Sequence, residues 1–190
     1  MKKYDIGIIG AGVAGSLAAL RVVEKYPQHK AVLFDTGRPP GKRRRQLEGF
    51  LGAMPAGDGK LYSNNLTEVL KICDGRKVNP IYNWLMNWMG EFGDLKVKKD
   101  LNPIPSMKKK LISDGWNIET NNYIQWKPES IHAWAKDFGH RLADAPNVDF
   151  HFDMEIDKIL KLEDGFHLYH DYDNEKKIFK DEFVCKKILI

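Results

Sequence analysis

Three glycines near the N-terminus constrain this chain more than any other feature of its sequence. Gly10, Gly12 and Gly15 have the spacing G-x-G-x-x-G and directly follow the apolar run 4–9. In such a pattern the first glycine permits a tight turn out of a strand. The second leaves the backbone bare, and the third lets a helix pack close to the strand. The sequence therefore predicts a buried strand over 4–9, a glycine turn, and a helix over 13–25.

An acidic residue follows at the end of the next apolar run. Residues 31–34 predict a second buried strand, which ends at Asp35, 20 residues after Gly15. A carboxylate there can accept the hydroxyls of an adenosine ribose, while the positive end of the helix holds phosphates. This strand–turn–helix–strand context predicts an α/β Rossmann-type nucleotide-binding fold. A glycine turn without a ligand is the alternative, and the acid at Asp35 argues against the 2′-phosphate of NADP.

The rest of the chain predicts helices first and strands afterwards. Helices are predicted over 65–73, 80–92, 107–112 and from 128 to about 145, with extended chain over 116–126. Strands are predicted over 148–152, 156–162, 166–172 and 178–185, and the last three have the spacing of a three-stranded antiparallel meander. A further apolar run at 188–190 predicts a strand that returns to the parallel sheet.

Several of these motifs resemble the FAD-dependent oxidoreductases of the glutathione-reductase-like superfamily. The matching stretches are 5–15, 32–35, the loop 37–45 and the glycine-rich segment that ends at 57–61. The resemblance implies FAD as the cofactor, with Asp35 on the adenosine ribose and hydride transfer carried out by the flavin itself. The meander favours FAD over NAD, because a plain NAD domain would more often repeat βαβ units. An NAD-linked dehydrogenase domain is the alternative.

The resemblance also implies which residues bind the cofactor. In the family, the basic loop after the acidic residue approaches the adenine or pyrophosphate, and a Gly-Asp-Gly-Lys-like stretch lies near the flavin. A backbone segment just before the meander meets the adenine. The residues that take these places are Gly10, Ala11, Gly12, Val13, Ala14, Gly15, Asp35, Thr36, Arg43, Arg44, Gly57, Asp58, Lys60 and Ile156. No metal ligand is predicted, and no general base is identified.

The same resemblance predicts one domain over 1–190 that is incomplete at its C-terminus. A helical insertion over about 65–146 would belong to the substrate side. The turn that closes over FAD in the family, and the later segment that binds the ribityl chain, would follow residue 190. We therefore expect the FAD-binding portion of a flavin-dependent oxidoreductase. The alternatives are a remnant that binds nucleotide without turnover and a chain that packs against a partner, such as a second chain that completes the fold.

Composition narrows the environment and the partners. The chain has 30 basic and 26 acidic residues, and this net charge of +4 does not call for a nucleic acid. Two distant cysteines form no disulfide framework, which indicates a reducing, cytoplasmic location. No apolar stretch approaches the ~20 residues of a membrane span, so we expect no membrane partner. The resemblance to flavin-dependent oxidoreductases implies a small-molecule substrate. Lys108–Lys110 are predicted to be a solvated helix face, and Trp84 and Trp88 core rather than a substrate platform.

Overall fold

The computed structural model describes most of the chain. The described residues are 1–39, 42, 49–57, 59–62, 70–95, 97–99, 105–115, 122–171, 173, 176 and 178–190. They form two compact units, the first made of Met1–Ala56 with Ala135–Ile190 and the second of Gly57–Trp134. Each unit is presented by itself below. In the described part of the chain, no helix has the length and apolar character needed to cross a membrane.

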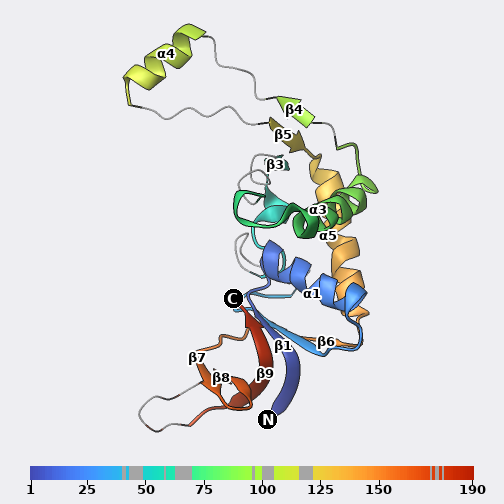
Figure 1. The fold of residues 1–190 in the computed structure, drawn as a ribbon, viewed down its shortest axis with the longest axis vertical. Helices are drawn as coiled ribbons and strands as arrows, with labels where there is room; N and C mark the ends of the chain where they lie inside the picture. Colours follow the sequence, from blue (N-terminus) through green and yellow to red (C-terminus); the bar gives the residue numbers. More distant parts are fainter. Residues whose placement is uncertain are drawn as a thin grey trace. The chain divides into compact units, whose positions relative to one another are not determined.

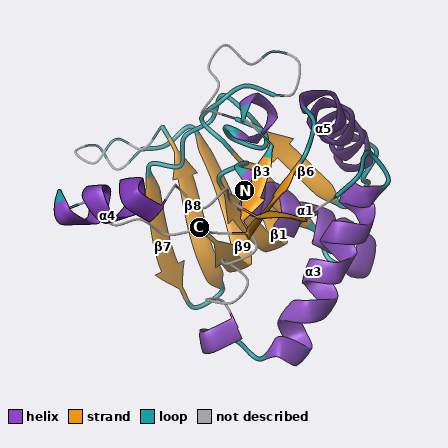
Figure 2. Ribbon diagram, turned by 90° about the horizontal axis from the view of Figure 1, so that it is seen from above, coloured by secondary structure: helices purple, strands orange, loops and turns teal. Residues whose placement is uncertain are grey.

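A six-stranded sheet forms the centre of the first unit (Figure 2). Its strands are β1 (Lys2–Ile9), β2 (Ala31–Phe34), β6 (Val148–His151), β7 (Lys158–Leu162), β8 (Gly165–His170) and β9 (Asp181–Leu189). They lie in the order β6-β2-β1-β9-β8-β7. The pairs β6–β2, β2–β1 and β1–β9 are parallel, whereas β9–β8 and β8–β7 are antiparallel. The predicted α/β fold with a parallel sheet and an antiparallel meander is therefore confirmed.

The parallel part of this sheet has a topological switch point at β1. The chain passes from β1 to β2 on one side and later returns to β9 on the other. Figure 1 shows the blue β1 beside the red β9. Helix α1 (Val13–Lys25) begins beyond the carboxyl end of β1. In open α/β sheets, ligands bind outside the carboxyl ends of the strands at such a point.

One detail of the meander differs from the prediction. The runs 178–185 and 188–190 were predicted as separate strands, but β9 is continuous over Asp181–Leu189. Its two edges explain the difference. One edge pairs antiparallel with β8 from Asp181 to Cys185, and the other pairs parallel with β1 from Phe183 to Leu189. The overlap leaves no place for a break, so the exposed Lys186 and Lys187 lie within the strand.

Helix α1 and the core of the sheet follow directly from the sequence pattern. The helix has the predicted bounds, and its buried residues recur at helical spacing: Gly15, Ser16, Ala19, Leu20 and Val22. It packs against β1, β2 and β6. A further core cluster consists of Tyr4, Val32, Phe34, Leu168, Phe183 and Cys185. This cluster draws on β1, β2, β8 and β9, and it therefore ties the meander to the parallel strands.

The second unit contains a small sheet and helices. The antiparallel strands β3 (Lys60–Tyr62), β4 (Val97–Lys99) and β5 (Asn122–Gln125) lie in the order β3-β5-β4. The helices are α3 (Gly75–Gly90), α4 (Pro105–Ser113) and the start of α5 (Pro128–Ala143), whose last residues belong to the first unit. Most of the helix predicted over 65–73 lies outside the described residues.

Helix α3 begins five residues before its predicted start. The Asp74 side chain accepts a hydrogen bond from the Arg76 N–H at 2.9 Å and caps the N-terminus, so Pro80 lies inside the helix. The spacing of Ile81, Leu85, Trp88 and Phe92 predicts one apolar helix face, which is only partly correct: Trp88 is buried, Leu85 and Phe92 are half-buried, and Ile81 is 50% exposed.

Tryptophans form much of the core of the second unit. Trp88 lies 4.9 Å from Trp134 and 5.8 Å from Trp84 between ring centroids, and Trp126 lies 5.9 Å from Trp134. Trp88, Trp126 and Trp134 are buried. The core interpretation of Trp88 is therefore confirmed, and Trp84 is a half-buried neighbour of that core. The spacing of apolar residues in α5 predicts a stripe of Ile131, Trp134, Ala135, Phe138 and Leu142, and all of these are buried except Ala135, which is half-buried.

Candidate functional site

The glycine turn has the geometry that its spacing predicts. Gly10 has φ +102°, a left-handed conformation that favours glycine, and its N–H donates to the Phe34 carbonyl at 2.8 Å. A Cβ on Gly15 would lie only 1.9 Å from the Gly10 carbonyl oxygen. Helix α1 can therefore approach the end of β1 this closely only because residue 15 has no side chain.

Gly12 differs from Gly15 in what surrounds it. It is the N-cap residue of α1, and a Cβ built on it would meet no heavy atom of the described residues within 4 Å. The first N–H groups of a helix have no partner within the helix and carry its positive dipole end. The start of α1 thus faces open space at Gly12, with Val13 half-buried and Ala14 exposed. This arrangement suits an anion such as a phosphate group.

Asp35 lies directly against this turn. Its Oδ2 accepts a hydrogen bond from the Ala11 N–H at 2.5 Å, and its Oδ1 accepts one from the Gly37 N–H at 2.7 Å. An ionised carboxylate has about four lone-pair sites, so each oxygen can accept a second hydrogen bond. The carboxylate is therefore held in place and keeps the capacity to accept the hydroxyls of a sugar.

Ala11 holds the turn together through both of its backbone groups. It is fully buried, its N–H donates to Asp35, and its carbonyl accepts from the Leu51 N–H at 2.7 Å and from the Ser16 Oγ at 2.8 Å. Among the predicted cofactor-binding residues, Ala11 is thus a structural member of the turn. Sequence reasoning missed Ser16 and Leu51. A serine on the buried face of α1 was the available signal for Ser16, and nothing in the sequence marked Leu51.

The segment Gly49–Ala56 borders the same turn. Leu51 is buried with φ +62°, a left-handed conformation that is uncommon for leucine, and Gly52 follows with φ +54°. A Cβ on Gly52 would lie 3.8 Å from the Gly12 Cα. The backbone at Leu51 and Gly52 therefore limits the space next to Gly12 from a second direction.

A third backbone segment completes the surroundings of Asp35. After β6, the Asp153 N–H donates to the Gly37 carbonyl at 2.9 Å and the Met154 N–H to the Asp35 carbonyl at 3.0 Å. Ile156 is half-buried and packs against the core cluster of the sheet. The segment that leads to Ile156 is therefore joined to Asp35, which in turn is joined to the glycine turn.

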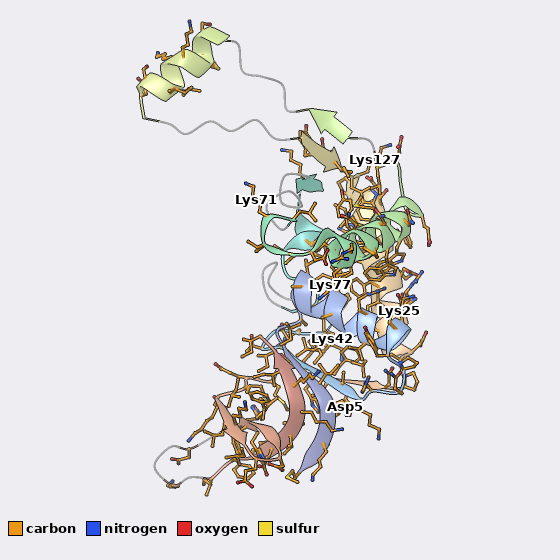
Figure 3. The ribbon with its side chains drawn as sticks, in the orientation of Figure 1. Asp5, Lys25, Lys42, Lys71, Lys77 and Lys127 are labelled. Carbon is orange, nitrogen blue, oxygen red and sulfur yellow. The ribbon has the colours of Figure 1, made fainter. Side chains whose placement is uncertain are left out.

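The remaining predicted residues are distributed over the chain. Thr36 is exposed beside Asp35, and Arg43, Arg44 and Asp58 lie outside the described residues. Lys42, labelled in Figure 3, belongs to the same basic loop and is exposed.

Two predicted residues, Gly57 and Lys60, belong to the second unit. Both are in the described part of the chain, and the Lys60 Nζ lies 5.6 Å from the centre of the Tyr123 ring. Their assignment to the cofactor stays a prediction.

An apolar hollow of about 270 Å³ lies elsewhere in the first unit. Its described lining includes Phe50, Phe150 and Phe152, together with Leu142 of α5, and none of the described lining residues is charged. Such a hollow suits an apolar group and offers no group for chemistry.

A cluster of ionisable side chains lies in the meander. The ring of the buried His167 contacts Glu182 through Nδ1 and Asp164 through Nε2, both at 2.7 Å. The hydrogen bond to Asp164, and then the one to Glu182, raises the pKa of His167. This cluster links β8, β9 and the turn after β7, and it contains no residue of the glycine turn.

Three further side chains could meet at a metal ion. Ligand atoms of Asp157, His170 and Asp171 lie within 4.8 Å of one another. His170 Nδ1 donates to the Glu155 carbonyl at 2.8 Å, and Asp171 also lies 3.8 Å from the Lys180 ammonium. The two aspartates are exposed, and we assign no metal to this group.

The fold is similar to those of solved FAD-dependent enzymes. PqsL, described as a probable FAD-dependent monooxygenase from Pseudomonas aeruginosa, matches 98% of this chain with 12% identity and a TM-score of 0.51. Glycine oxidase from Geobacillus kaustophilus matches 99% with 14% identity and a TM-score of 0.54. NikD, an unusual amino acid oxidase essential for nikkomycin biosynthesis, matches 99% with 9% identity and a TM-score of 0.53.

The share of each solved enzyme that this chain covers, and the low sequence identity, limit what can be concluded from these matches. This chain spans 42% of PqsL, 55% of the glycine oxidase and 51% of NikD. No protein-family model matches the sequence, and no curated protein sequence matches it. At these identities the likeness shows the fold and not the activity. The chain has the Rossmann-type α/β fold that is found in FAD-dependent monooxygenases and oxidases, over about half of their length.

Proposed function

We propose that this chain binds FAD at the glycine turn and is the FAD-binding portion of a flavin-dependent oxidoreductase. One observation carries the proposal. No heavy atom of the described residues fills the space at the bare Gly12 backbone, at the switch point of the sheet, and the Asp35 carboxylate is fixed beside it by the Ala11 N–H. A pyrophosphate needs the first feature, and an adenosine ribose needs the second.

The residues fit the ADP half of the cofactor. In this proposal the start of α1, at Gly12, Val13 and Ala14, binds the pyrophosphate, and Asp35 accepts hydrogen bonds from the ribose hydroxyls. Gly10, Gly15 and Ala11 keep the turn in shape, as their contacts indicate. When bound, the flavin supplies the capacity to accept and release a hydride, whereas the protein supplies binding and orientation.

The finer assignments extend this proposal. Thr36, Arg43 and Arg44 would approach the adenine or the pyrophosphate, and the backbone before Ile156 would meet the adenine. The hydrogen bonds from Asp153 and Met154 to the segment after β2 support the last assignment.

On the flavin side we propose Gly57, Asp58 and Lys60, with a small molecule as the substrate of the complete enzyme. We also propose a place within the glutathione-reductase-like superfamily, from the resemblance of stretches 5–15 and 32–35, and a cytoplasmic location, from two distant cysteines that form no disulfide framework. The antiparallel meander β7-β8-β9 supports FAD over NAD as the cofactor.

Nucleotide titration tests the proposal. Purified protein freed of bound nucleotide would be titrated with FAD, ADP, FMN and NADH, with tryptophan and flavin fluorescence as readouts. We expect saturable binding of FAD and ADP, and FMN at least about tenfold weaker, because FMN lacks the adenosine and one phosphate. Binding of NADH without FAD would replace this function by an NAD-linked one. Folded protein that binds none of the four would contradict it.

A further inference from the structure

Two side chains of opposite charge form an ion pair close to Asp35. The Arg38 Nε lies 3.7 Å from the Asp153 Oδ1. Arg38 is in the loop after β2, whereas Asp153 follows β6, so the pair joins two segments that are far apart in the sequence. Both segments belong to the first unit and border the candidate site.

The backbone fixes both residues next to Asp35. The Asp35 Oδ1 accepts a hydrogen bond from the Gly37 N–H at 2.7 Å, and the Gly37 carbonyl accepts one from the Asp153 N–H at 2.9 Å. Arg38 follows Gly37 directly, and a Cβ on Gly49 would lie only 2.5 Å from the Arg38 carbonyl oxygen. The two carboxylates and the guanidinium are therefore parts of one local group.

The stability of the fold does not account for a carboxylate at position 153. The Arg38 side chain is 38% exposed and the Asp153 side chain 63%. Ion pairs as exposed as this one contribute little to folding stability. Asp153 also has φ +54°, a left-handed conformation that is uncommon outside glycine, aspartate and asparagine.

The types of residue in this group bear on one position of a nucleotide. In dinucleotide-binding folds an acidic residue binds the free hydroxyls of the adenosine ribose, whereas a nearby arginine accommodates the 2′-phosphate of NADP. This chain has both, since Arg38 follows Asp35 at three positions' distance. A carboxylate beside the guanidinium competes with a phosphate for its charge and its hydrogen bonds.

We propose that Asp153 is a positioning residue that makes the site select nucleotides with an unphosphorylated ribose. Asp153 engages Arg38, and the group of one guanidinium and two carboxylates has a net charge of −1. That charge disfavours a 2′-phosphate, whereas a free hydroxyl can donate to Asp35. FAD and ADP are thereby accepted, and NADP is excluded. This inference rests on the proposed function and adds to it the residue that sets this specificity.

Calorimetric titration of the full chain with ADP-ribose and 2′-phospho-ADP-ribose tests the inference, since the two compounds differ only in the 2′-phosphate. The wild type should bind ADP-ribose at least about tenfold more tightly. Asp153→Asn should narrow this ratio by about tenfold, because the released guanidinium can form charge-assisted hydrogen bonds to the phosphate. Its affinity for ADP-ribose should stay within about twofold of the wild type. Asparagine tolerates the left-handed conformation, so the variant should stay folded.

Two further variants show whether Asp153 acts through Arg38. In an Arg38→Gln background, Asp153→Asn should lose most of its effect on the ratio. Asp157→Asn removes another exposed carboxylate after β6 and should leave the ratio unchanged.

The failure of this inference differs from the failure of the proposed function. A ratio that Asp153→Asn leaves unchanged would overturn the inference, as would an undiminished effect in the Arg38→Gln background or a wild type that prefers the 2′-phosphate. A wild type that binds neither compound would contradict the proposed function itself, and the inference with it.

Discussion

Gly12 and Gly15 are the same residue type in opposite surroundings. A Cβ on Gly15 would overlap the Gly10 carbonyl oxygen at 1.9 Å, whereas a Cβ on Gly12 would meet no heavy atom of the described residues within 4 Å. We therefore expect Gly15→Ala to lower the free energy of unfolding by about 1–3 kcal/mol, as overpacking typically does. Gly12→Ala is the matched control and should change it by less than about 0.5 kcal/mol. Urea denaturation of both variants checks this, and equal effects would contradict the geometry.

The two cysteines also have opposite surroundings. Cys185 is buried in the core cluster, and burial raises the pKa of its thiol to about 11, whereas Cys73 is exposed. Since the thiolate is the reactive form, a thiol reagent at pH 8 should modify Cys73 rapidly and Cys185 only after unfolding. The Cys73→Ser variant should then show almost no fast reaction. A fast reaction that persists in this variant would contradict the burial of Cys185.

The residues of the site were predictable where their role is local in the sequence. Gly10, Gly15 and Asp35 follow from spacing, because their conformations depend on one strand, one turn and one helix. Leu51 donates a hydrogen bond to Ala11 from 40 positions away and has a left-handed conformation. No local pattern could predict it.

At the scale of elements, the meander depends on pH through His167. The hydrogen bonds to Asp164 and Glu182 raise the pKa of His167 above its ordinary 6.5, and the bond with His167 lowers the pKa of Asp164 below 3.8. The raised histidine pKa contributes stability that is complete below pH 6.5 and is lost as the pH rises through the raised value. The lowered aspartate pKa contributes stability above pH 3.8 that is lost as the pH falls.

The substitution His167→Gln should therefore destabilise the protein most between pH 3.8 and 6.5, and less as the pH rises above that range. Urea unfolding of the wild type and the variant over a pH series measures the difference. A difference that is independent of pH would show that His167 contributes only through packing.

Helix α5 provides a prediction for the second unit. Trp134 is fully buried between Trp88 and Trp126, and its removal would leave a large cavity. We expect Trp134→Ala to destabilise the second unit by about 3–5 kcal/mol. Far-ultraviolet circular dichroism during thermal unfolding measures the loss. A change below about 1 kcal/mol would contradict the assignment of this cluster as the core.

The elements themselves were predicted where one period dominates. The bounds of α1 and β2 agree with the prediction, because one face of α1 and all of β2 are buried. The continuity of β9 was not predictable, since Lys186 and Lys187 interrupt the apolar pattern and only the pairing with β1 carries the strand across them. The exposure of Ile81 was not predictable either, because it depends on which residues from elsewhere in the chain pack against α3.

At the scale of the whole molecule, the order of strands decides where a ligand can bind. The sequence predicts a βαβ unit and a meander, and the structure joins both in one sheet through β9. The switch point between β2 and β9 then coincides with the glycine turn. Of the small sheet β3-β5-β4, only β5 was predicted, as part of the extended chain over 116–126. The pairing was not predictable, because the strands have only three or four residues and lie far apart in the sequence.

Calorimetric titration of FAD into the wild type and Gly12→Val tests the central claim most directly. The valine side chain would occupy the open space at the start of α1, so the variant should stay folded and lose FAD binding by at least about 100-fold. Equal affinity of both proteins, with equal thermal stability, would show that the cofactor does not lie on the glycine turn.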